Sequence, residues 1–147
     1  MNNLAKFYIN GAWVAASDDA RLHPVTNPAT EASEGDISLA GKKDVDLAIQ
    51  AARDAFESFS QTPLDERLKM LARILEVYQS RLDDMADAIS REMGAPRHTL
   101  AAKVQAPMGM GHAQTTLEAA KSFEFDQQLG RARVRREPVG VVAMITP

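Results

Sequence analysis

The apolar run at the end of the chain constrains its fold most. Residues 139–145 read Val-Gly-Val-Val-Ala-Met-Ile, with no charged or polar side chain. A near-continuous run of this kind is typical of a strand buried on both faces of a parallel sheet, because helices cover both faces of such a sheet. A parallel strand needs a neighbour, and no segment after this run could supply one. We therefore expect an α/β fold of which this sequence is a truncated part.

Short antiparallel strands are predicted before the helices. Asn10-Gly11 lies between two β-prone stretches within residues 6–15. Because both turn residues tolerate a positive φ, this pattern predicts a tight β-hairpin. Asn27-Pro28 is typical of a turn. Apolar and polar side chains alternate over residues 36–40, which predicts a further short strand.

Helical spacing of apolar side chains begins at Asp44 and continues to Phe59. A second amphipathic stretch starts near Leu64 and ends at Gly94, with a break expected near Ser80. Its apolar stripe predicts that three leucines are buried, namely Leu71, Leu75 and Leu82. Both stretches are long enough for helices that cover one face of a core.

Residues 97–122 are helical in composition but contain Pro107, Gly109 and Gly111. This predicts a short helix, a break near Pro107 and a second helix to about Lys121. Residues 123–137 alternate apolar and polar side chains around Leu129-Gly130. That alternation predicts a two-stranded ribbon, which we expect to leave the helical body rather than pack flat on it.

Composition narrows the function classes. The chain has 147 residues, a net charge of -3 and 45% hydrophobic residues, which is ordinary for a globular protein. This charge gives no reason to expect nucleic acid or a membrane surface as a partner. No apolar run approaches the roughly 18 residues that cross a bilayer, and the N-terminus lacks the apolar core of a secretion signal. We expect a cytoplasmic protein.

Few residues could carry chemistry. The chain has no cysteine, which excludes disulfides, thiolate metal sites and thiol nucleophiles within it. Its three histidines are scattered without partners at metal-ligand spacing, so a structural or solvated role is favoured for His23, His98 and His112. Gly109-Met110-Gly111 has neither the preceding strand nor the third glycine of a dinucleotide fingerprint, so we interpret these glycines as structural.

Two charged features leave alternatives open. Glu92 precedes the end of a predicted helix, an unfavourable place for an acid, so a cation partner is worth considering. The one basic run contains Arg131, Arg133, Arg135 and Arg136. The first three would share one strand face, which could bind a partner subunit or an anionic ligand. A solvated face that protects a sheet edge is the favoured interpretation.

Residues 136–147 resemble the segment that opens the dinucleotide-binding sheet of aldehyde dehydrogenases. Other stretches agree with this family in the same order: Phe7 to Gly11 with Trp13, Val25 to Thr30, Asp44 to Phe56, Glu66-Arg67, and Glu92-Met93-Gly94. The chain departs from the family pattern at Glu31, where the family usually has a glycine. The resemblance covers almost the whole chain.

The resemblance implies three segments. Residues 1–121 would be the N-terminal part of the dinucleotide-binding domain, built from a β-hairpin and several α-helices. Residues 122–137 would be a projecting oligomerisation ribbon that pairs with another subunit, which makes a homo-oligomer, a dimer or a tetramer, the expected assembly. Residues 138–147 would be the first strand of a Rossmann-like sheet.

It also implies a reaction and its sites. The parent protein would oxidise a small-molecule aldehyde to a carboxylic acid with NAD or NADP, through a cysteine thiohemiacetal and a thioester. The family's cysteine and glutamate would lie beyond the chain, so no catalytic residue is expected in it. Backbone atoms that touch the dinucleotide would belong to Ile145, Thr146 and Pro147. A monovalent-cation site would use the carbonyls of Val25 and Thr26 and the acid of Glu92.

Two rival functions are compatible with the same features. One is a non-catalytic relative of the family that acts as a structural or interaction subunit. Reading the downstream sequence for the cysteine and the glutamate would discriminate it from an enzyme. The other is a self-standing helical interaction module of 147 residues. The terminal apolar run argues against this second rival, because a buried strand requires a sheet.

Overall fold

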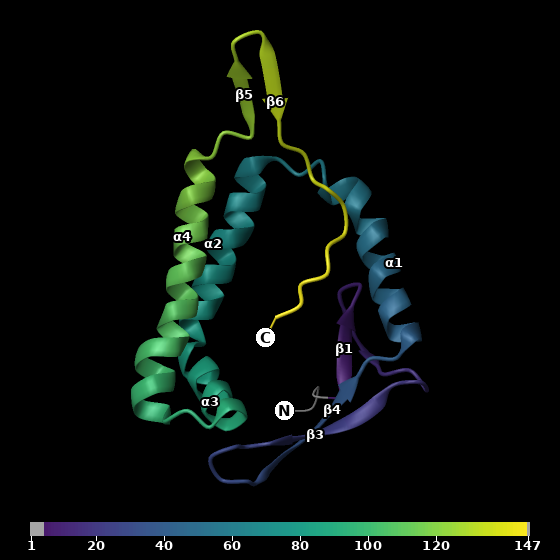
Figure 1. Ribbon diagram of the computed structural model, residues 1–147, viewed down its shortest axis with the longest axis vertical. Helices are drawn as coiled ribbons and strands as arrows, with labels where there is room; N and C mark the ends of the chain where they lie inside the picture. Colours follow the sequence, from purple (N-terminus) through teal and green to yellow (C-terminus); the bar gives the residue numbers. More distant parts are fainter. Residues whose placement is uncertain (1–4, 147) are drawn as a thin grey trace. The chain divides into compact units, whose positions relative to one another are not determined.

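The computed structural model describes residues 5–146. They form helices and three two-stranded antiparallel ribbons, so the predicted mixture of helices and strands is confirmed (Figure 1). The chain divides into two compact units, one made of residues 5–61 with 140–146 and the other of Thr62–Val139. The division into three segments that the resemblance implies concerns the domains of the whole protein and stays a prediction.

The first unit begins with the predicted hairpin. Strand β1 (Lys6–Ile9) pairs with β2 (Ala12–Ala15), and the turn residues Asn10 and Gly11 have φ values of 50° and 77°. Two positive φ values in succession give the tight turn whose twist matches the flanking strands. The hairpin is therefore confirmed.

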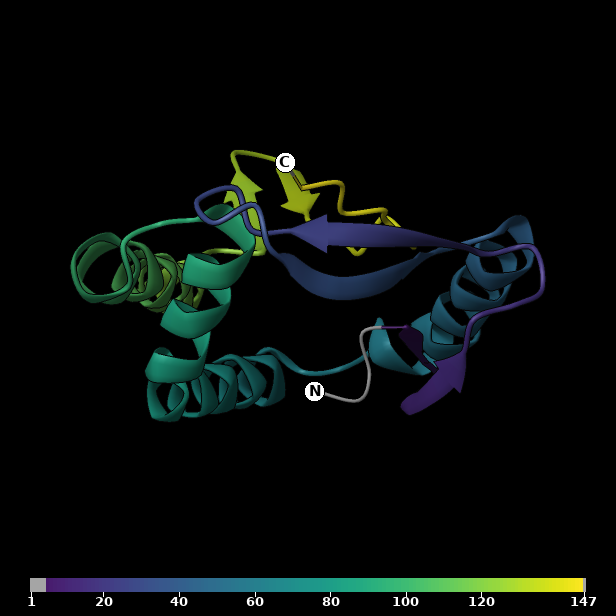
Figure 2. The same cartoon turned by 90° about the horizontal axis from the view of Figure 1, so that it is seen from below.

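A second ribbon pairs β3 (Arg21–Thr26) with β4 (Ser33–Leu39), and Figure 2 shows it lengthwise. Strand β4 confirms the strand expected over residues 36–40 and extends it toward the N-terminus. Strand β3 was not predicted, because Pro24 in its middle argues against a strand. A two-stranded ribbon tolerates proline, since half of each strand's N–H groups point away from the partner.

Asn27 forms the turn between these strands and is buried. Its side-chain oxygen accepts a hydrogen bond from the backbone N–H of Ala29 at 2.9 Å, and its carbonyl accepts one from Glu31 at 2.8 Å. The turn ends with Glu31 in the left-handed region, at φ 59°. Helix α1 (Lys42–Phe59) follows β4 and confirms the first predicted helix.

The second unit contains the remaining helices. The expected break falls at Arg81, between α2 (Leu64–Ser80) and α3 (Leu82–Met93), and α3 ends at Gly94 with φ 72°. A π-helical segment, η1 (Arg97–Gln105), leads into α4 (Ala106–Ser122). The helix passes from η1 into α4 at Ala106 without interruption, so the break expected near Pro107 is wrong, and the chain there changes from π-helical to α-helical hydrogen bonding.

Small side chains make up the core of the second unit. Ala86, Ala95, Ala101 and Ala106 are buried and pack together, with Leu82 and Ile89 against them. Alanines let helix backbones approach closely, which suits the short connections between α3, η1 and α4. Of the three leucines expected to be buried, Leu75 is buried, whereas Leu71 and Leu82 are half-buried. Burial is therefore confirmed for Leu75, and full burial of Leu71 and Leu82 in the whole protein stays a prediction.

The predicted ribbon is confirmed. Strand β5 (Asp126–Leu129) pairs with β6 (Ala132–Arg135), and Gly130 in the turn has φ 62°. Within this unit the ribbon projects past the adjacent ends of α2 and α4 instead of lying on them (Figure 1). All four residues of β6 are exposed.

The terminal apolar run does not form the predicted strand. Residues 136–146 are assigned neither helix nor strand, and Val139, Met144 and Ile145 are at least 90% exposed. A β-strand exists only through hydrogen bonds to a neighbouring strand, and no described segment provides that neighbour. The prediction of a strand over the terminal apolar run is therefore wrong for the residues that the structure describes.

Candidate functional site

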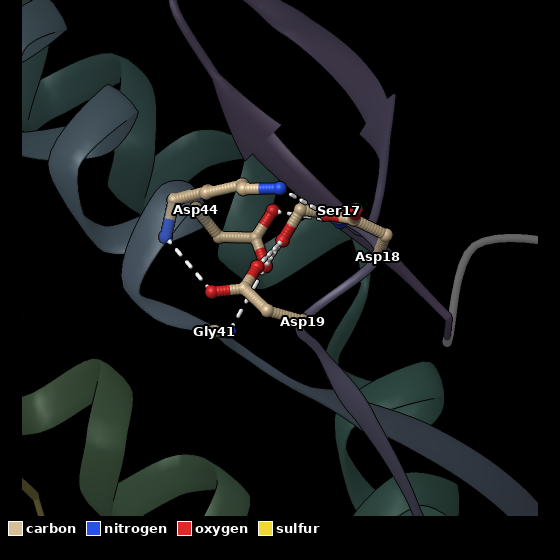
Figure 3. Close-up of polar contacts among 6 residues, drawn as sticks. Ser17, Asp18, Asp19, Gly41 and Asp44 are labelled. Carbon is tan, nitrogen blue, oxygen red and sulfur yellow. Dashed lines mark hydrogen bonds and ion pairs between the residues drawn. The ribbon is translucent and has the colours of Figure 1, made fainter.

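Asp44 is the buried acid at the start of α1, with only 3% of its surface exposed. Its carboxylate accepts hydrogen bonds from the backbone N–H of Ser17 at 2.9 Å, the Ser17 hydroxyl at 2.6 Å and the backbone N–H of Gly41 at 3.0 Å. Figure 3 shows these contacts around the loop after β2. We call Ser17, Asp19, Gly41 and Asp44 the acid clamp.

Asp19 occupies the other side of the clamp. Its carboxylate lies 2.5 Å from the Ser17 hydroxyl and accepts the backbone N–H of Lys43 at 3.3 Å. Since one hydroxyl carries one proton, Ser17 donates to either Asp19 or Asp44 at any moment. The Ser17 hydroxyl is the largest cause that lowers the pKa of each carboxyl, and backbone N–H groups at the helix start lower it further.

The clamp joins the loop after β2 to the N-terminal end of α1, where carboxylates are favoured by the helix dipole. Both Asp44 oxygens accept backbone N–H groups of this chain, and Asp19 shares the one Ser17 proton with Asp44, so we assign the clamp a structural role. Sequence reasoning missed it. The signal that could have found it is an acid three residues after Gly41, in the position that accepts the first backbone N–H of a helix.

The expected cofactor residues are accessible but lack a strand to hold them. Ile145 is 93% exposed and Thr146 is exposed, whereas Pro147 lies outside the described residues. The backbone of Ile145 and Thr146 makes no hydrogen bond to another residue within 5–146. Their N–H and C=O groups can therefore serve a ligand or a neighbouring strand, and their role in binding a dinucleotide stays a prediction.

A hollow of about 470 Å³ lies in the same unit, along α1. Ile49, Arg53 and Phe56 line it from the helix, and Gly140, Val141 and Ala143 line it from the terminal run. Helical spacing of four and three residues places the first three side chains on one face. The hollow has apolar walls and one arginine. It suits an apolar segment, or a molecule with an apolar part and a negatively charged group near Arg53.

The residues of the expected cation site belong to separate units. Val25 and Thr26 end strand β3 in the first unit, and Glu92 is exposed in the last turn of α3 in the second. Among residues 5–146, no three His, Asp or Glu side chains gather as metal ligands would. The site stays a prediction that depends on carbonyls from one unit and a carboxylate from the other.

The remaining sequence candidates have local roles or none. His23, His98 and His112 are exposed. In the basic run, Arg133 forms an ion pair with Asp126, and Arg135 lies 3.4 Å from Glu137. These pairs fit the favoured interpretation of a solvated ribbon face. No helix within residues 5–146 has the length and apolar composition that a bilayer crossing needs.

Comparison with known proteins gives one consistent result. A family model described as the aldehyde dehydrogenase family matches residues 13–147. The 3-succinoylsemialdehyde-pyridine dehydrogenase of a Pseudomonas species is 46% identical over 147 residues, which is 100% of this chain and 31% of that protein. The chain thus spans about a third of the length of the curated relatives it matches.

Solved structures agree. An aldehyde dehydrogenase from Bartonella henselae is 40% identical, with a TM-score of 0.83 over 89% of this chain and 27% of that one. Aldehyde dehydrogenase C from Pseudomonas syringae, solved with NAD+ and octanal, is 34% identical. Its TM-score is 0.86, and the match covers 93% of this chain and 28% of that one. An aldehyde dehydrogenase from Mycobacterium tuberculosis with NAD+ is 29% identical. Its TM-score is 0.82, and the match covers 92% of this chain and 29% of that one.

Proposed function

The chain belongs to the aldehyde dehydrogenase family, and from that premise we propose that its protein oxidises an aldehyde to a carboxylic acid with NAD or NADP. The observation that carries the proposal is the family match over residues 13–147, supported by similarity to structures that hold NAD+. When bound, the nicotinamide accepts the hydride that leaves the substrate carbon.

This chain would contribute part of the wall around the dinucleotide rather than the reacting groups. The exposure of Ile145 and Thr146 supports this role, because their N–H and C=O groups are free to bind polar atoms of a dinucleotide. Pro147 belongs to the same proposal and lies outside the described residues. The chain has no cysteine, so the thiol nucleophile of such a reaction has to come from another part of the protein.

The ribbon β5–β6 would pair with a second subunit and make the protein a homo-oligomer. Its open edges and fully exposed β6 support this role, because an unpaired strand edge is a template for pairing with another chain. We further propose that the carbonyls of Val25 and Thr26 and the carboxylate of Glu92 bind a monovalent cation. Hard oxygen ligands suit such an ion. A cytoplasmic location remains a prediction.

The test uses the full-length product of the gene with a panel of aldehydes and either NAD or NADP, following the absorbance of the reduced nicotinamide. We expect aldehyde-dependent reduction that thiol alkylation abolishes. Exchange of potassium for a large organic cation should lower the rate if the cation site is occupied, and Glu92→Gln should remove that sensitivity. Absence of turnover with every aldehyde and both cofactors would contradict the proposal and favour a structural subunit.

A further inference from the structure

Four side chains stack at the root of the β5–β6 ribbon. The guanidinium of Arg67, in the first turns of α2, lies 5.2 Å from the ring centroid of Phe125. The rings of Phe125 and Phe123 meet edge to face at 4.8 Å, and the Arg136 guanidinium lies 5.2 Å from the Phe123 ring. Two cations therefore flank two aromatic rings. Figure 1 shows the ribbon beside the adjacent ends of α2 and α4.

The two arginines differ in their hydrogen bonds. Arg136 donates to the Glu124 carbonyl at 3.1 Å and to the Gln127 side chain at 3.2 Å, and its backbone N–H donates to the Phe125 carbonyl at 2.8 Å. The Arg67 guanidinium donates no hydrogen bond to any residue in 5–146, and its Nε is shielded from solvent without an acceptor. The Arg136 guanidinium thus finds its hydrogen-bond acceptors in and beside the ribbon, whereas the Arg67 guanidinium has none among the described residues.

The position of Arg67 adds to this imbalance. A cation near a helix N-terminus faces the positive end of the helix dipole, which is unfavourable. The neighbouring acids, Asp65 and Glu66, both pair with Lys69 instead, at 3.4 and 2.8 Å. The shielded Nε of Arg67 is left without an acceptor, which is unfavourable because an N–H group removed from water loses a hydrogen bond.

We propose that Arg67 binds a carboxylate supplied from outside the Thr62–Val139 unit, with its terminal nitrogens as a fork at the root of the ribbon. A carboxylate fits because it neutralises the charge and accepts two N–H groups of one guanidinium at once. The Phe125 ring lies against the guanidinium and limits the directions in which the fork can point. The carboxylate belongs either to the rest of the same polypeptide or to a second copy of it.

The experiment compares the thermal midpoint of the full-length gene product with that of Arg67→Met, Arg67→Lys and Arg73→Met. Arg73 is a matched control, since it lies on the same helix and makes only an exposed ion pair with Glu76. We expect Arg67→Met to lower the midpoint by about 3–10 °C, Arg67→Lys to lower it less, and Arg73→Met to leave it within about 2 °C.

Loss of the stacking on Phe125 has to be separated from loss of the carboxylate. In a Phe125→Leu background the stacking is already absent, so Arg67→Met should still lower the midpoint. If the carboxylate comes from a second copy, the drop in thermal midpoint caused by Arg67→Met depends on protein concentration, and sedimentation shows weaker association. The drop is independent of concentration when the carboxylate comes from the same polypeptide.

Two results would overturn the proposal. The first is an Arg67→Met protein as stable as the parent or more stable, because replacing an unpaired guanidinium by an apolar side chain is neutral or favourable. The second is no effect of Arg67→Met in the Phe125→Leu background, which would leave the stacking as the whole role of Arg67. Both readouts are independent of catalytic activity, so they stand apart from the test of the proposed reaction.

Discussion

The hydroxyl of Tyr78 donates a hydrogen bond to the backbone carbonyl of Ala106 at 3.0 Å and thereby ties α2 to the first turn of α4. The contact requires a residue without a side chain one turn further along α4. A Cβ atom on Gly109 would lie 2.6 Å from the Tyr78 hydroxyl oxygen. The glycine is therefore structural, in agreement with the interpretation of Gly109-Met110-Gly111 from the sequence.

Replacing Gly109 by alanine should destabilise the protein. The added methyl group has to displace the Tyr78 hydroxyl, which breaks its hydrogen bond and leaves the packing of the two helices disturbed. We expect a loss of about 1–3 kcal/mol in the free energy of unfolding, measured by urea denaturation of the full-length gene product.

Gly111→Ala is the matched control for this variant. A Cβ atom on Gly111 meets nothing within 4 Å, and the residue lies inside the same helix. Alanine is the better helix former by about 0.5–1 kcal/mol, so Gly111→Ala should stabilise the protein. Equal effects of the two substitutions would contradict the role assigned to Tyr78.

Glu31 is predicted to be a strained position. It has a φ of 59°, a conformation that costs a residue with a side chain about 1–2 kcal/mol and that glycine adopts freely. We expect Glu31→Gly to raise the free energy of unfolding by about 0.5–1 kcal/mol after the greater flexibility of glycine in the unfolded chain is subtracted. Glu57→Gly, in the last turn of α1, should instead lower it, because glycine is less favourable in a helix by up to about 1 kcal/mol.

The acid clamp should make stability depend on pH. The pKa of Asp44 is lowered in the folded protein, chiefly by the Ser17 hydroxyl, so folding favours the ionised carboxylate. Its contribution is fully present above the pKa of an unfolded aspartate, about 3.9, and is lost as the pH falls through the folded value. The gap in urea midpoint between the parent and Asp44→Asn should therefore be large at pH 6 and shrink below pH 4.

Asp46→Asn provides the control for the clamp. Asp46 lies on the same helix and pairs only with Lys42 at the surface. Because exposed ion pairs contribute little, this variant should follow the parent at every pH. The difference in urea midpoint between Asp44→Asn and the parent is the decisive quantity. If it stays the same from pH 6 to pH 3, the clamp does not stabilise the charged form of Asp44.

Leu75→Ala should cost more stability than Leu71→Ala or Leu82→Ala. Leu75 is 9% exposed, whereas Leu71 and Leu82 are half-buried. Removal of its buried methyl groups should cost about 2–4 kcal/mol, with smaller losses at the other two positions. Ile74→Ala is the neighbouring control, because Ile74 is 58% exposed and should be near neutral. A thermal melt in which Leu75→Ala matches Ile74→Ala would contradict the assigned packing.

Local sequence patterns predicted the elements whose causes are local. The positive φ values of Asn10-Gly11 and Gly94 follow from residue type, and the helices follow from the spacing of apolar side chains. Strand β3 escaped prediction because Pro24 obscured it. The acid clamp escaped it because Ser17 and Asp44 meet across 27 residues. Contacts of this kind depend on the path of the chain, which single-sequence patterns do not encode.

The terminal run shows the opposite case. Its composition predicts a buried strand, yet Val139 and Ile145 are more than 90% exposed. The pattern reports what the residues favour in a complete sheet, and the hydrogen-bonding neighbour decides whether the strand forms. The candidate cofactor residues could be proposed only from the family resemblance, because backbone contacts leave no signature in side-chain type.

Residues 1–147 on their own should not reduce NAD or NADP with any aldehyde. The reaction proposed for the protein needs a thiol nucleophile, and this chain has no cysteine. The exposed run that includes Val139, Met144 and Ile145 should instead make the isolated chain self-associate, because it leaves apolar backbone unpaired. Purified chain mixed with an aldehyde panel and either cofactor should give no more reduced nicotinamide than a sample without protein. Light scattering should show aggregates that decrease when Val142 and Met144 are replaced by lysine. Turnover that survives removal of contaminating host enzyme would show that the chemistry resides in these residues and that the assignment of their role is wrong.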